Sequence, residues 1–136
     1  MIIALKAGAT YFAIVYLAGF VLGTVRVLLV VPRVGELTAV LLETPLILAV
    51  SWTGSRWCVD RFAVPQKASP RVVMGSSALV LLLLGELGVS LFAFGRPWAD
   101  TLAAFRSPPG LIGLSAQGVF ALLPLFQAIL PQRRRQ

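Results

Sequence analysis

The sequence contains no histidine and only one cysteine, Cys58. Without histidine the chain lacks the usual axial ligand of a membrane haem, the commonest zinc ligand and the usual general base near neutral pH. A single cysteine cannot form an intrachain disulfide. We therefore expect no cofactor and no metal site. Because no nucleophile and base pair is apparent either, we identify no catalytic residue and favour a non-enzymatic protein.

Charged residues are also scarce, at 12% of the chain, whereas soluble domains carry about a quarter. Hydrophobic residues make up 58%, and the mean hydropathy is +0.90. The formal net charge of +7 would suggest nucleic acid as the partner of a soluble protein. Here the basic residues flank apolar stretches, where they set the orientation of membrane spans. We therefore predict an integral membrane protein that contacts the lipid bilayer and binds no nucleic acid.

Four apolar stretches are long enough to cross a bilayer, for which a helix needs about 20 residues. They cover residues 7–31, 37–55, 72–95 and 110–130. A chain of 136 residues has room for one domain. The sequence thus predicts a single all-α membrane domain over residues 1–136, a bundle of four transmembrane helices joined by short hairpins.

The loop between the third and fourth spans, residues 96–109, carries an amphipathic pattern of its own. Trp98, Leu102 and Phe105 fall at i, i+4 and i+7, on one face of a helix, and Asp100 falls on the opposite face. This pattern predicts a short helix that lies in the outer membrane interface. Such a helix would either cap the bundle or contact a partner.

Lysine and arginine are distributed unequally between the two ends of the predicted spans. Eight lie at the two termini and in the loop between the second and third spans: Lys6, Arg56, Arg61, Lys67, Arg71, Arg133, Arg134 and Arg135. Three lie on the other side: Arg33, Arg96 and Arg106. The positive-inside rule then predicts cytoplasmic N- and C-termini. Arginine outnumbers lysine ten to two, as in GC-rich bacterial genes, so we expect a multi-pass protein of a bacterial inner membrane.

Each predicted span contributes one strongly polar residue to a common layer: Arg26, Glu43, Glu86 and Gln117. At 1.5 Å of rise per residue, all four lie roughly 10–14 Å below the outer surface. Ionisable groups inside membrane spans mark functional sites by default. Because an arginine can bridge two carboxylates, we predict one charge network or binding site with Arg26 as its hub.

Small and polar neighbours accompany this layer. Thr44 adjoins Glu43 and adds a hydroxyl group. Gly19 and Gly23 share a helical face with Arg26 in a G-x-x-x-G pattern, which permits close helix packing in membranes.

Three functions are compatible with the layer, and an intramembrane enzyme acting on a lipid or quinone ranks last because no nucleophile–base pair or metal constellation supports it. The other two are nearly equal. If Arg26, Glu43 and Glu86 only hold the helices together, the protein is a small accessory or assembly subunit that works with a membrane protein partner or as a homo-oligomer. If the excess negative charge holds a proton or binds a cation, it is a small oligomeric transporter or proton-coupled carrier that uses Glu43 and Glu86. The first is slightly favoured, because the two halves of the chain show no internal repeat.

Overall fold

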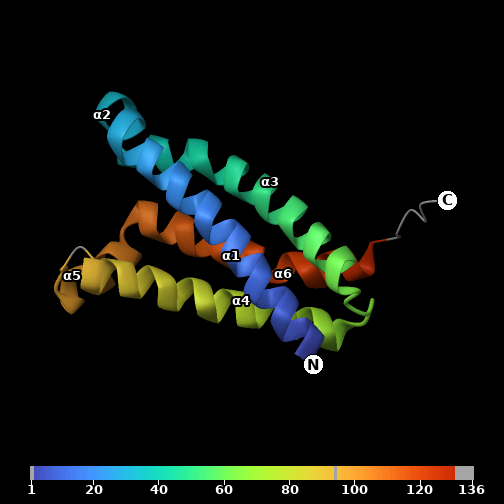
Figure 1. Ribbon diagram of the computed structural model, residues 1–136. Helices are drawn as coiled ribbons and strands as arrows, with labels where there is room; N and C mark the ends of the chain where they lie inside the picture. Colours follow the sequence, from blue (N-terminus) through green and yellow to red (C-terminus); the bar gives the residue numbers. More distant parts are fainter. Residues whose placement is uncertain (1, 94, 131–136) are drawn as a thin grey trace.

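The computed structural model describes residues 2–93 and 95–130 (Figure 1). Nearly all of these residues are helical, and no strand occurs in the two ranges. Four continuous helical stretches are long and apolar enough to cross a membrane: Ile2–Val34, Glu36–Phe62, Ala68–Ala93 and Pro108–Ile129. The prediction of an all-helical chain with four candidate membrane spans is therefore confirmed.

The first stretch changes its helical pitch near its end. It begins as α1 (Ile2–Val25), widens into a π-helical segment η1 (Arg26–Val30), and closes with the short α2 (Val31–Val34). The Val31 amide donates to the carbonyl of Arg26, five residues earlier. Pro32 follows directly, and a proline can neither donate to the preceding turn nor fit closely against its carbonyl. The wider turn accommodates that proline, and it begins at Arg26.

The turn into the second stretch consists of Gly35 alone. Gly35 has a φ of +84°, a conformation that glycine adopts without strain. The helix that follows, α3 (Glu36–Phe62), extends seven residues past the predicted end of the span at residue 55. Arg56 and Arg61 are therefore helical, and the connection to the next helix is reduced to residues 63–67.

The second half of the chain contains two long helical stretches and one short helix. It comprises α4 (Ala68–Gly88), which continues into the π-helical η2 (Val89–Ala93), then α5 (Trp98–Arg106) and α6 (Pro108–Ile129). The short helix predicted in the loop is present as α5. It is attached through Thr101, which is buried and shares a hydrogen bond of 3.0 Å with Ser90 of η2. Trp98 and Leu102, which were predicted to share the apolar face of this helix with Phe105, are exposed at the surface of the protein.

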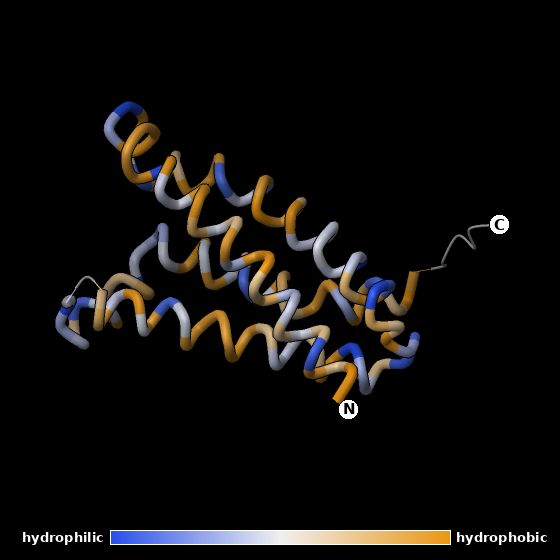
Figure 2. The backbone as a smooth tube through the Cα atoms, viewed as in Figure 1, coloured by the Kyte–Doolittle hydropathy of each residue, from blue (hydrophilic) through white to orange (hydrophobic). Residues whose placement is uncertain are grey.

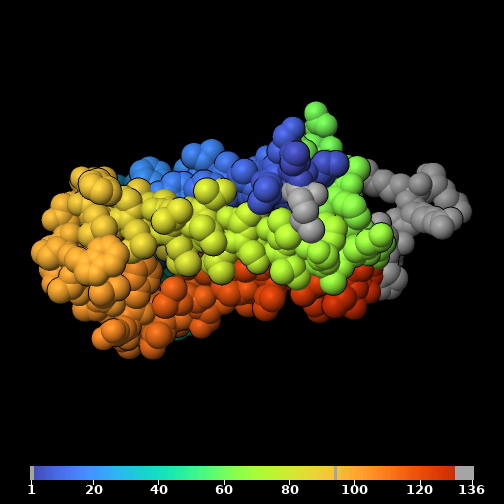
Figure 3. Space-filling view, turned by 90° about the horizontal axis from the view of Figure 1, so that it is seen from below, coloured from blue at the N-terminus to red at the C-terminus, as the bar shows by residue number. Residues whose placement is uncertain are grey.

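The four long helices pack side by side, and α1 and α6 each contact both α3 and α4. Figure 3 shows α1 and α4 lying next to each other along one face of the molecule. The bundle has two different ends. The terminal end holds the beginning of α1 and residues 63–67, and the turn end holds Gly35 and α5. The α1–α3 pair and the α4–α6 pair lie close together at the terminal end and diverge toward the turn end (Figure 1).

The packed core occupies the half of the bundle nearer the terminal end. Its buried members are Ala7, Tyr11, Val15, Cys58, Val59, Val64, Met74, Ala78, Leu82 and Phe120. Glycine allows the closest helix contacts here: Gly8 faces the Met74 carbonyl and Gly75 faces the Ala121 carbonyl, with no room for a Cβ atom at either glycine. Hydrophilic residues gather at the two ends of the bundle, around the Gly35 turn and α5 and around residues 63–67 (Figure 2). The long helices between them are predominantly apolar, as lipid-facing helices are.

Candidate functional site

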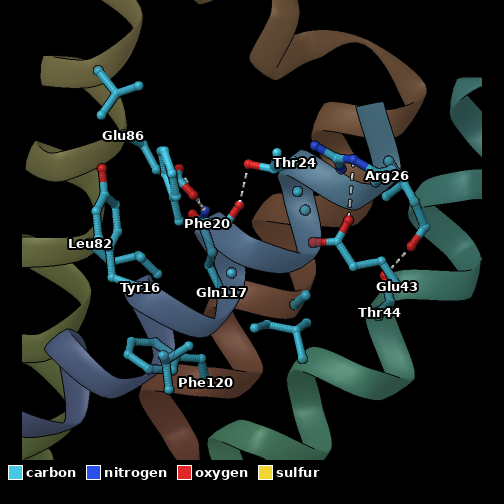
Figure 4. A pocket seen from close by; sticks show the side chains of 18 of the residues that line it. Tyr16, Phe20, Thr24, Arg26, Glu43, Thr44, Leu82, Glu86, Gln117 and Phe120 are labelled. Atoms are coloured by element: carbon cyan, nitrogen blue, oxygen red, sulfur yellow. Dashed lines mark hydrogen bonds and ion pairs between the residues drawn. The ribbon is translucent and has the colours of Figure 1, made fainter. Parts of the chain in front are cut away.

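A cavity of about 700 Å³ lies between the helices on the turn-end side of the packed core. Residues from all four long helices line it, and its walls are mainly apolar. Pockets for drug-sized ligands span about 300–1,000 Å³ and combine apolar walls with a few placed polar groups. Arg26, Glu43, Glu86 and Gln117 all line this cavity. The sequence therefore grouped four residues that the structure brings to one place (Figure 4).

Arg26 and Glu43 form an ion pair between η1 and α3. The distance between Arg26 Nε and Glu43 Oε2 is 3.2 Å, and the two side chains are 31% and 17% exposed. Gly23 lies one turn before Arg26, and a Cβ atom at Gly23 would stand 3.9 Å from Arg26 Nη2. The guanidinium group therefore folds back along α1 and lies beside Gly23. The pair is partly open to the cavity.

Glu86 and Gln117 form a second pair, between α4 and α6. Gln117 Nε2 donates to both carboxylate oxygens of Glu86, at 2.7 Å each. The Tyr16 hydroxyl donates to the carbonyl of Gly85, the residue before Glu86, at 3.2 Å. Glu86 is therefore held by an uncharged amide, with a tyrosine ring beside it.

The polar layer is consequently divided into two pairs and has no single hub. In residues 2–93 and 95–130, the contact between Arg26 and Glu43 is the one ion pair, and Glu86 is bonded to Gln117 instead of Arg26. Figure 4 shows the two pairs separated within the cavity. Depth along each span indicates which residues share a layer, but it does not indicate which helices are neighbours. Although α1 contacts both α3 and α4, Arg26 lies in η1, which contacts α3. The α1–α3 and α4–α6 pairs diverge toward the turn end (Figure 1), so Arg26 meets Glu43 and Glu86 meets Gln117.

The remaining predicted residues line the cavity without joining either pair. The Thr44 hydroxyl donates to the Val40 carbonyl within α3 at 2.8 Å, so this donor is already used. Gly19 and Gly23, which were predicted to allow close helix packing, both line the cavity, and a Cβ atom at Gly19 would stand 3.7 Å from the Ile47 side chain of α3. Helix backbones approach most tightly at other glycines, among them Gly8 and Gly75.

A second hollow of about 330 Å³ lies between the polar layer and α5. It shares Arg26, Glu86, Ser90, Arg96 and Gln117 with the first cavity. The two hollows therefore meet at the polar layer, and the second one extends toward the turn end. That Arg96 borders both hollows could not be predicted from the sequence, because its placement depends on the positive φ of +60° at Gly95 and the turn that follows.

Two buried acceptor atoms in the layer lack a hydrogen-bond partner, Glu43 Oε2 and Gln117 Oε1. Glu43 Oε2 lies near Arg26 Nε, but the contact lacks hydrogen-bond alignment and is a charge–charge contact only. Buried polar groups in folded proteins are nearly always bonded, so an unpaired one calls for a functional or structural explanation.

Within the described residues, no group of three histidine, cysteine, aspartate or glutamate side chains is placed to hold a metal ion. Comparison of the chain with protein-family models, with curated proteins and with solved structures finds no match. The site must therefore be interpreted from its own chemistry.

Proposed function

We propose that this protein is a small proton-coupled membrane carrier that binds a solute in the cavity and takes up protons on the carboxylates of Glu43 and Glu86. The observation that carries the proposal is that the two polar pairs face a cavity of about 700 Å³ instead of packing against each other. Charged side chains inside a membrane normally pair within protein or line a pathway for ions or solutes. A layer that serves only to join helices has no need of an adjoining space.

The hydrogen bonding of the layer supports the same conclusion. A purely structural polar network is favourable when every member is satisfied, because an unpaired buried acceptor costs about 1–3 kcal/mol. Here Gln117 Oε1 has no hydrogen-bond partner, and Glu43 Oε2 has only its charge contact with Arg26. A bound solute or a proton offers the missing donors, provided that the side chains turn toward the cavity.

The bundle is closed at one end of the site, as a carrier in one of its access states would be. Beyond the cavity, toward the terminal end, the rings of Tyr11 and Phe120 are stacked with centroids 4.3 Å apart. Met74 and Ala78 are fully buried in the same region. Toward the turn end the second hollow continues from the polar layer. We infer access from the turn end, with the packed half as the closed gate.

The orientation that we propose follows the distribution of basic residues. Residues 56, 61, 67 and 71 lie at the terminal end together with Lys6, and the turn end carries Arg33, Arg96 and Arg106. Arg133, Arg134 and Arg135 lie outside the described residues. The positive-inside rule favours a cytoplasmic terminal end in a bacterial inner membrane, so the cavity would open to the outside, with α5 in the outer interface.

Proton flux in liposomes tests this function. The purified protein is reconstituted with a trapped pH-sensitive dye, and a potassium diffusion potential is imposed. We expect a potential-driven proton flux that Glu86→Gln reduces at least tenfold. The matched control is Asp100→Asn, which removes a carboxylate from exposed α5 and should leave the flux unchanged. Flux no faster than in protein-free liposomes, or the same in Glu86→Gln, would contradict the proposal.

An accessory or assembly role is the second candidate, and one observation favours it. Each polar pair joins two neighbouring helices, α1 with α3 and α4 with α6, as a helix-fastening contact would. In this role the protein would act beside a membrane protein partner or as a homo-oligomer. It predicts that Glu86→Gln weakens the bundle or its assembly and that the wild type conducts no protons.

A further inference from the structure

The electrostatic balance of the cavity distinguishes between classes of solute. Arg26 and Glu43 lie in contact and offset each other's charge. Glu86 is hydrogen-bonded to the neutral amide of Gln117 and forms no ion pair in the described residues, so the charge of Arg26 reaches it only from beyond contact distance. Arg96 borders the cavity but is exposed outside the membrane-spanning stretches, where water and salt screen its charge. With Arg26, Glu43 and Glu86 all counted as ionised, the part of the cavity within the spans therefore carries one excess negative charge.

The wall beside Glu86 is aromatic. The Tyr16 ring lines the same cavity and is bonded through its hydroxyl to Gly85, the residue before Glu86, on which it packs so closely that a Cβ atom at Gly85 would lie 3.0 Å from the ring. Phe20, one turn along α1, lines the cavity with 60% of its surface exposed. Phe120 forms part of the cavity wall at the packed core. Aromatic faces attract cations and also contact apolar groups favourably.

A bare metal ion does not suit this arrangement. Calcium and magnesium take six or more oxygen ligands, or keep several of their waters. Glu86 offers one carboxylate beside an amide that donates to it, and the surrounding wall is mainly apolar. An organic cation needs no such ligand set, because its charge is spread and its body is apolar.

From these features we propose that the cavity binds a monovalent organic cation with an apolar body, with Glu86 as the counter-charge and Phe20 and Tyr16 as the wall. The inference deepens the proposed function by naming the class of solute. It does not require that the protein transports that solute, so the two can fail separately.

Calorimetric titration of the protein in phosphatidylcholine nanodiscs tests the inference. The probe is tetraphenylphosphonium, whose permanent charge excludes any contribution from its own protonation. The control ligand is tetraphenylborate, which has nearly the same shape and the opposite charge. We expect saturable binding of the phosphonium at one site, weakened at least tenfold by Glu86→Gln and about threefold to tenfold by Phe20→Ala. Asp100→Asn should bind like the wild type.

Phe20→Ala should alter the cavity wall without unfolding the protein, because this side chain is largely exposed and contributes little to the packed core. Absence of saturable phosphonium binding, equal affinity for the two probes, or an unchanged affinity in Glu86→Gln with native helicity would overturn the inference. Proton flux without phosphonium binding would contradict the solute class alone. Phosphonium binding without proton flux would support the cation site and count against the coupled carrier.

Discussion

The Tyr11 hydroxyl donates a hydrogen bond of 2.7 Å to the carbonyl of Phe120, and both residues are fully buried. This carbonyl has no donor within its own helix, because the residue four positions later is Pro124, which lacks an N–H group. A side chain of α1 thus satisfies a backbone acceptor that a proline in α6 leaves unpaired. The same ring stacks on Phe120, so one residue closes the end of the cavity in two ways.

Replacing Tyr11 by phenylalanine keeps the stacked ring and removes only this donor. We expect Tyr11→Phe to lower the free energy of unfolding by about 1–3 kcal/mol, since it leaves a buried carbonyl unpaired. In a Pro124→Ala background the new amide can bond to Phe120, so the same substitution should then cost less. Unfolding titrations in mixed detergent micelles measure both effects. Equal losses in the two backgrounds would show that the bond does not compensate for the proline.

Two glycine positions differ sharply in the space around them. A Cβ atom at Gly75 would collide with the backbone carbonyl of Ala121, whereas at Gly118 no atom lies within 4 Å. Gly75→Ala should therefore force α4 and α6 apart and destabilise the bundle by about 1–3 kcal/mol. Gly118→Ala, the matched control, should be neutral or stabilise by up to about 1 kcal/mol, because alanine favours the helix. Thermal unfolding measures the stability of both variants relative to the wild type. If Gly75→Ala is as stable as the wild type, the close contact between α4 and α6 does not exist.

Double-mutant cycles distinguish two separate pairs from a network with one hub. The cycle of Arg26→Met with Glu43→Gln should give a coupling of about 1–2 kcal/mol, less than for a fully buried pair because both side chains are partly exposed. The cycle of Arg26→Met with Glu86→Gln should give a clearly smaller coupling, since no ion pair joins these two residues in the described structure. If the second coupling equals or exceeds the first, the arginine does bridge both carboxylates.

Much of this architecture could be predicted from the sequence, for identifiable reasons. The four spans follow from the length of apolar stretches that a bilayer requires, and the common depth of Arg26, Glu43, Glu86 and Gln117 follows from the regular rise of a helix. The pairing within the layer could not be predicted, since it depends on which helices are neighbours. The G-x-x-x-G pattern at Gly19 and Gly23 indicated close helix packing, but it did not indicate that helix backbones approach most tightly at other glycines, among them Gly8 and Gly75. A small-residue stripe shows where a helix can be approached, but it does not show whether a neighbour or a cavity lies there.

Membrane orientation is testable with reporter fusions. Alkaline phosphatase inserted after Gly35 or Ser107 should be active, because both positions lie at the turn end, which we place outside the cytoplasm. Insertion after Val64, in the connection between α3 and α4, should be inactive. The reverse pattern of activities would show that the turn end lies in the cytoplasm, so that the cavity would open to the cytoplasm.

The central claim is that the polar layer borders an open, hydrated cavity, and thiol labelling tests it most directly. Cys58 is fully buried and serves as an unreactive internal reference. Ala116→Cys places a thiol on the cavity wall of α6, and Leu122→Cys places one on an exposed apolar face of the same helix. Thiols ionise and react in water but not in lipid. With a small water-soluble methanethiosulfonate, we predict that Ala116→Cys reacts at least tenfold faster than Leu122→Cys or Cys58. If all three thiols react equally slowly, the layer is dry and packed, and the account of the cavity as a binding site is contradicted.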